Sequence, residues 1–182
     1  MKSSPPCRLT AVIVSLLMMV ISHNLLATTP PSAQTSITRE DILNTTDLTN
    51  GVKQAVAAGN LDSITQWQQK AADVANALGL PQSDIDYLQS AYIKNYLIFN
   101  AKRLLFNDAI EHAYYSLESI APIKQRYPEA KDLFPQADKL FAQRDQLIQQ
   151  IATELAKGQP LTNEIMQQAK AQFKSQMGHV PH

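Results

Sequence analysis

Apolar residues recur at steps of three and four along most of the chain, which is the spacing of an amphipathic α-helix. The pattern predicts helical segments over residues 52–58, 61–78, 83–105, 108–121, 136–157 and 163–176, after a short first element that Thr38 and Asp41 could cap. The stripe of the second of these segments consists of Leu61, Ile64, Trp67, Ala71, Val74 and Leu78. No run of alternating β-branched residues interrupts the pattern, so we expect one all-α domain over residues 38–177, with about five to six helices.

The segment 83–105 differs from the others because its apolar residues cover most of the helix circumference. A helix of this kind is usually packed by neighbours on several sides, so we expect it to be the central helix. Breaks are expected in the Asn- and Thr-rich stretch 44–51, at Gly79 and at Asn107, which could cap the following helix. Short connections favour antiparallel neighbours, and they leave two architectures open, a closed bundle or stacked helical hairpins.

The stretch Leu105–Glu111 resembles the turn and the start of the second helix of a tetratricopeptide repeat. Phe106 and Ala109 stand where that repeat has an aromatic and a small residue. A less similar turn over 58–64 lies 46 residues earlier, whereas the repeat is about 34 residues long. Leu97 replaces the signature glycine of the repeat. The resemblance covers one turn region and implies helical hairpins.

The first 27 residues have the three-part order of a secretory signal peptide. Lys2 and Arg8 give a positively charged start, residues 9–21 are apolar, and a more polar stretch ends at Ala27, where we expect cleavage. Cleavage after Ala33 is the alternative site. An uncleaved membrane anchor is the other interpretation, although a spanning helix needs about 20 apolar residues.

The segments on either side of the predicted domain contain few apolar residues. Residues 28–37 are rich in Pro, Ser and Thr, which predicts a flexible linker, and residues 178–182 are expected to form a disordered tail. Cys7 is the only cysteine and lies within the predicted signal peptide. An exported protein without disulfides is more typical of a bacterial periplasm than of small disulfide-rich secreted domains.

Charge argues against several classes of partner. The chain has 16 basic and 16 acidic residues, and removal of the signal peptide takes away Lys2 and Arg8 but no acid, which gives a formal charge of −2. Such a balance supplies no electrostatic attraction to nucleic acid or to anionic lipid. We therefore expect no nucleic-acid partner, and membrane contact only through the N-terminal segment if it is retained.

The sequence contains no recognisable catalytic motif. It lacks a glycine-rich phosphate loop, and none of its serines lies in a glycine-flanked turn. His112 lies near Asp108 and Glu111 on the predicted helix, but these residues are more simply explained as a charged surface than as a metal site. The other candidate ligands, His179 and His182, belong to the tail. We expect neither a cofactor nor a metal, and no enzymatic activity.

Aromatic residues with a polar edge are the best candidates for a partner or ligand surface, although packing between helices could also explain them. They are Trp67, Tyr92, Tyr96, Tyr114 and Tyr115. The leading hypothesis is therefore a periplasmic, non-enzymatic helical protein that acts as a protein-interaction or accessory factor of the cell envelope. The alternatives are a carrier of a small apolar ligand and, if the signal is retained, a membrane-tethered subunit; an enzyme with an unrecognised site ranks last.

Overall fold

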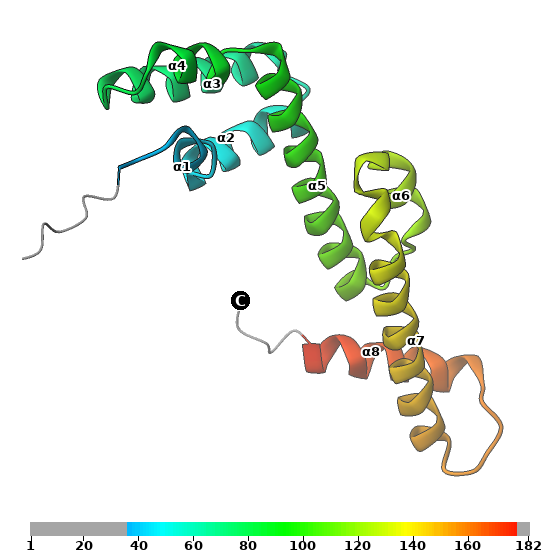
Figure 1. Ribbon diagram of the computed structural model, residues 1–182. Helices are drawn as coiled ribbons and strands as arrows, with labels where there is room; N and C mark the ends of the chain where they lie inside the picture. Colours follow the sequence, from blue (N-terminus) through cyan, green and yellow to red (C-terminus); the bar gives the residue numbers. More distant parts are fainter. Residues whose placement is uncertain (1–35, 178–182) are drawn as a thin grey trace, which may run out of the picture. The chain divides into compact units, whose positions relative to one another are not determined.

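The computed structural model describes residues 36–177. The predicted signal peptide, most of the predicted linker (28–35) and the predicted tail (178–182) lie outside the described residues. Residues 36–177 form eight α-helices and one 3₁₀ helix, with no strand among them, which confirms the all-α prediction (Figure 1). Within this range no helix is long and apolar enough to cross a membrane.

Short connections join the first three helices, which pack on one another. They are α1 (Arg39–Leu43), α2 (Thr46–Ala57) and α3 (Leu61–Ala77). The predicted capping box is present, because the Thr38 hydroxyl accepts a hydrogen bond from the Asp41 amide and the Asp41 carboxylate accepts one from the Thr38 amide. The Asp41 carboxylate accepts hydrogen bonds from both the amide and the hydroxyl of Thr38, and these bonds hold the pKa of Asp41 below its usual range. The Asn60 side chain caps α3 by accepting a hydrogen bond from the Ser63 amide.

Helix α2 begins six residues earlier than expected. The Asn- and Thr-rich stretch was predicted as a break up to Gly51, but the helix starts at Thr46 and continues through that glycine. Leu48, Gly51, Val52 and Ala55 share the buried face of α2, so tertiary packing overrides the weak helix propensity of glycine.

The predicted segments 83–105 and 108–121 are divided differently in the structure. A break at Gln89–Ser90 separates α4 (Gln82–Leu88) from α5 (Ala91–Ser116), and α5 passes through Asn107 without interruption. Two caps cause the break: the Ser90 hydroxyl accepts a hydrogen bond from the Ile93 amide, which starts α5, and donates one to a carbonyl of α4. The prediction of a helix start at Asn107 was therefore wrong, and so was the repeat-like turn placed there.

The C-terminal half contains α6 (Ala121–Arg126), the 3₁₀ helix η1 (Pro128–Leu133), α7 (Phe134–Ala156) and α8 (Asn163–Met177). Helix α8 crosses the C-terminal part of α7 and packs on it (Figure 1). The hydroxyl of Thr162 accepts a hydrogen bond from the Ile165 amide, as the predicted start of the last helix requires. Helix η1 is attached to α5 by two ion pairs, Lys102 with Glu129 and Arg103 with Asp132.

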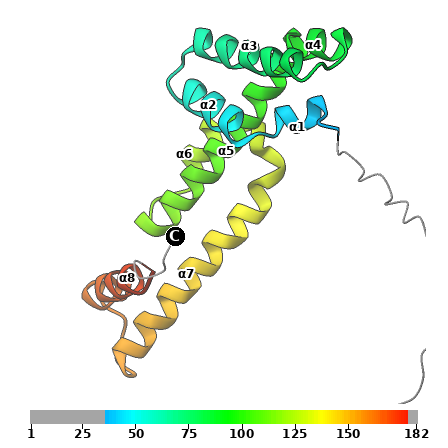
Figure 2. The same cartoon turned by 90° about the vertical axis from the view of Figure 1, so that its left-hand side faces the viewer.

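The buried side chains form three clusters that follow one another along the chain. The first joins α1–α4 to the start of α5, the second joins the rest of α5 to η1 and the start of α7, and the third lies between α7 and α8. Helix α5, drawn in green in Figure 2, is one continuous helix. It is about 39 Å long at 1.5 Å per residue, and it supplies side chains to the first two clusters. It therefore has the central place that was predicted for the segment 83–105, but without neighbours all round.

Two buried polar side chains donate hydrogen bonds to carbonyls at the ends of neighbouring helices. Gln68 of α3 is only 5% exposed, and its Nε2 donates to the carbonyls of Leu88 (2.7 Å) and Ser90 (2.8 Å) at the break between α4 and α5. Arg144 of α7 is 6% exposed and donates to the carbonyls of Ala113 and Glu118 at the end of α5, each at 3.2 Å. The Ser90 carbonyl also accepts a hydrogen bond from the Lys94 amide, and the Ala113 carbonyl one from the Glu118 amide, so the two side chains add hydrogen bonds at these helix ends.

Candidate partner-binding groove

The buried face of α3 is rotated away from the stripe that its sequence pattern predicts. The residues that α3 buries are Ile64, Gln68, Ala71, Ala72 and Ala75. Only two members of the predicted stripe belong to this set, whereas Val74 and Leu78 each remain 48% exposed. The rotation follows from Gln68, which must face the end of α4 to reach its carbonyls. The consequence is an apolar edge of α3 that no described helix covers completely.

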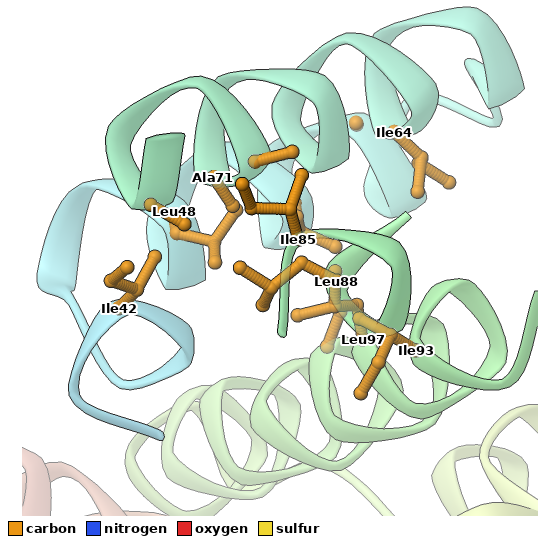
Figure 3. Close-up of a cluster of buried hydrophobic side chains, with 13 residues drawn as sticks. Ile42, Leu48, Ile64, Ala71, Ile85, Leu88, Ile93 and Leu97 are labelled. Carbon is orange, nitrogen blue, oxygen red and sulfur yellow. The ribbon is translucent and has the colours of Figure 1, made fainter. Parts of the chain in front are cut away.

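This edge lines a groove between α3 and the segment formed by α1 and α2. The groove has a volume of about 450 Å³, and its apolar lining comes from Ile42, Leu48, Trp67, Ala71 and Val74. Figure 3 shows Ile42, Leu48 and Ala71 at one end of the first buried cluster, well away from Ile93 and Leu97 on α5. The groove is thus an open end of the hydrophobic core rather than a separate cavity.

Trp67 is held in its place by close contact with a glycine. A Cβ atom added to Gly51 would lie 2.0 Å from Cε2 and 2.2 Å from Cζ2 of the indole. The indole therefore rests directly on the backbone of α2, and any larger residue at position 51 would displace it. The ring is half-buried and is the only tryptophan of the chain, so its fluorescence reports on this groove alone.

Charged side chains lie at the rim of the groove. Lys70 places its ammonium group 4.1 Å from the centroid of the Trp67 ring, at a distance that permits a cation–π interaction. Asp47 and Asp73 also line the groove, and neither forms an ion pair within residues 36–177. Asp73 accepts only a hydrogen bond from the Gln69 amide among its described side-chain contacts.

The five aromatic residues selected from the sequence do not share one surface. Trp67 lines the groove. Tyr92 and Tyr96 lie one turn apart near the start of α5 and are 66% and 41% exposed, with Phe99 continuing their row. This row is the side of α5 that was expected to be packed by neighbours and is not.

Tyr114 and Tyr115 lie in the second half of α5. Their rings meet edge to face with centroids 5.4 Å apart, and both are partly buried. Tyr114 also contacts Phe141 of α7 and Phe173 of α8, with centroids 6.1 and 5.9 Å away. The Tyr114 ring therefore joins the second and third buried clusters, which is a packing role.

The other depressions of the described surface are less apolar than the groove at Trp67. One of about 530 Å³ between α5 and α7 and one of about 410 Å³ between α1–α2 and α5 have a larger polar share in their lining than the groove at Trp67. Among residues 36–177 no group of three or more His, Cys, Asp or Glu residues could hold a metal ion. His112 is exposed, and its Nδ1 lies 4.0 Å from the Glu118 carboxylate.

Comparison of the chain with protein-family models, with curated proteins and with solved structures gave no significant match.

Sequence reasoning selected Trp67 but missed its charged surroundings. Asp47 was placed in a predicted break, where a polar residue attracts no attention. Lys70 lies three residues after the tryptophan and shares its side of α3, whereas Asp73 lies about 120° away from Trp67 round the helix, at the edge of the groove. This spacing was the signal available, but only the packing of α2 on α3 brings Asp47 to it.

Proposed function

We propose that this chain is an exported, non-enzymatic interaction protein of the cell envelope, and that it binds a partner protein through the groove at Trp67. The observation that carries the proposal is the open apolar edge of α3, where Trp67 and Val74 lie beside the exposed end of a buried cluster. Contiguous apolar surface of this kind in a folded domain commonly marks an interaction site.

The residue types of the groove also suit a partner surface. Tryptophan is among the residues that contribute most to binding energy when they are buried at an interface. The Gly51 contact fixes the indole before binding, so little conformational entropy remains to be lost when a partner covers it. The predicted export signal, together with the absence of cysteine after residue 27, favours a partner in the periplasm.

The test is affinity capture from envelope extracts with three matched baits. We expect a discrete partner with the parent protein, and loss of that partner with Val74→Gln, which changes the rim of the groove without touching the core. Leu161→Gln is the control, because Leu161 is similarly exposed (43%) but lies in the connection between α7 and α8. Equal capture by all three baits would exclude the groove as the binding site.

A small apolar ligand is the second candidate occupant. The groove volume of about 450 Å³ lies within the range of about 300–1,000 Å³ that is typical of ligand sites, and its lining is mostly apolar. Native mass spectrometry of the protein purified from its host separates the two functions. A bound compound that disappears with Val74→Gln would support the carrier, and repeated ligand-free spectra would contradict it.

A further inference from the structure

We propose that the segment recognised by the groove is a short amphipathic helix with Lys or Arg residues beside its apolar face. The inference rests on the proposed function of the groove and names the chemistry of the partner. Three features of the groove carry it, namely its direction along α3, the two carboxylates at its rim, and the cation that already lies on Trp67.

The direction of the groove fits a helix. Trp67, Ala71 and Val74 follow one another at steps of four and three residues along α3, so one wall of the groove runs parallel to the helix axis for about 10 Å, or two turns. Ile42 and Leu48 form the opposite wall. A partner helix placed in such a groove presents apolar side chains at the same steps, which is a common mode of peptide recognition.

The rim carries more negative than positive charge. Asp47 and Asp73 contribute two carboxylates and Lys70 one ammonium group, and the carboxylates are without ion-pair partners in the described part of the chain. Asp47 lies in the first turn of α2, where the helix dipole also favours an acid. Asp73 lies in the second half of α3, and its carboxylate accepts a hydrogen bond from the Gln69 side chain but forms no ion pair within residues 36–177. Such a carboxylate gains from a cation supplied by a partner.

Lys70 shows that a cation fits on the indole. Its ammonium group lies 4.1 Å from the ring centroid and is carried by an exposed, flexible side chain. A lysine or arginine of the partner can take the same place when Lys70 moves toward solvent, and it then has both carboxylates of the rim within the same groove. An acidic partner would instead be repelled by Asp47 and Asp73.

The test uses three synthetic helical peptides with an identical leucine face and with lysine, glutamine or glutamate on the polar positions. Their affinities for the purified protein are measured by the fluorescence of Trp67. We expect the lysine peptide to bind about fivefold more tightly than the glutamine peptide, and the glutamate peptide to bind weakest, since exposed ion pairs contribute up to about 1 kcal/mol each. Added salt should reduce these differences.

Two variants separate this inference from the proposed function. Val74→Gln should weaken all three peptides alike, because it removes apolar contact. The double variant Asp47→Asn/Asp73→Asn should abolish the preference for the lysine peptide over the glutamate peptide, because only the positive charge of Lys70 then remains at the rim. The matched control is Asp62→Asn/Glu154→Gln, which removes two exposed carboxylates from the corresponding ends of α3 and α7.

The possible outcomes are distinct. If Val74→Gln weakens binding but the parent protein binds all three peptides equally, the groove is a binding site and the basic partner is wrong. The same conclusion follows if the double variant at Asp47 and Asp73 keeps the preference for lysine, or if the control variant loses it. If Val74→Gln has no effect on any peptide, the groove itself is not the site and both proposals fail.

Discussion

Replacement of Gly51 by alanine tests the close contact that positions Trp67. At most interior helix positions, alanine in place of glycine raises the free energy of unfolding by about 1 kcal/mol. Here the new Cβ atom would lie 2.0 Å from Cε2 and 2.5 Å from Nε1 of the indole, far inside van der Waals contact. Either the ring must leave its place or α2 must move away from α3.

The gain in helix propensity stabilises the protein and the clash with the indole destabilises it, and the clash is the larger effect. Overpacking of this kind costs about 1–3 kcal/mol and sometimes more, and a rigid ring at 2.0 Å falls at the upper end. We therefore expect Gly51→Ala to lower the free energy of unfolding by about 2 kcal/mol, after the gain of about 1 kcal/mol in helix propensity is included. The emission of Trp67 should shift to longer wavelength as the ring becomes more exposed.

The assay is urea unfolding of a double-mutant cycle with Trp67→Leu, followed by circular dichroism. In the leucine background Gly51→Ala should be neutral or stabilising, which gives a coupling energy of about 2–3 kcal/mol. Gly59→Ala is the control: Gly59 has a positive φ of 67° and no atom within 4 Å of an added Cβ, so alanine should cost about 1 kcal/mol in both backgrounds. A Gly51→Ala protein as stable as its parent would refute the contact.

Three further predictions concern side chains that hold the helices together. Gln68→Glu should lower the free energy of unfolding by about 3 kcal/mol, because the Leu88 and Ser90 carbonyls lose the Gln68 donor and face a carboxylate. The control Gln66→Glu, on the exposed side of α3, should change it by less than about 0.5 kcal/mol. Urea unfolding measures both. Arg144→Met should cost about 2–3 kcal/mol and speed hydrogen exchange at the end of α5, while Arg126→Ala should not. Burial alone would raise the pKa of Glu129, but the hydrogen bond and charge of its lysine partner hold it below the usual range. The stability linked to this lowered pKa is complete only above the ordinary glutamate pKa of about 4.3. It is lost as the pH falls through the lowered pKa of the folded state, so the urea midpoint should depend less on acid pH in Glu129→Gln than in the parent.

Each of these predictions has a clear contrary result. A Gln68→Glu protein as stable as Gln66→Glu would mean that the side chain does not hold the break between α4 and α5. Unchanged exchange in Arg144→Met would remove its role at the end of α5. An unchanged slope of stability with pH in Glu129→Gln would show that the ion pair between α5 and η1 adds no pH-dependent stability.

The sequence predicted the all-α class well because its apolar spacing and its helix-capping residues are strong local signals. The cap at Thr38 was predicted from residue type and spacing and is present in the structure. Asn60 and Thr162, which are also favoured capping residues, begin the helices predicted from residues 61 and 163. The break before α5 was missed, although Ser90 is a favoured capping residue, because the apolar pattern continues on both sides of it. In the same way, Asn107 resembles a cap but lies between Phe106 and Ile110, which are both buried and keep α5 continuous.

The orientation of α3 and the composition of the groove could not be obtained in this way. The apolar stripe of α3 points to one face, but Gln68 turns another face inward because its amide satisfies two carbonyls of a distant segment. Only that rotation leaves Val74 exposed and brings Trp67 onto Gly51. A rule that treats every glutamine as a surface residue cannot predict this rotation of α3.

The most direct test of the central claim is site-specific photo-crosslinking in living cells of the host. A photoreactive amino acid is placed at Val74 in the groove, or at Leu161 as the control. We expect a discrete crosslinked partner from position 74 that is absent from position 161. No crosslinked partner from position 74, or the same product from both positions, would contradict the assignment of the groove as the interaction site.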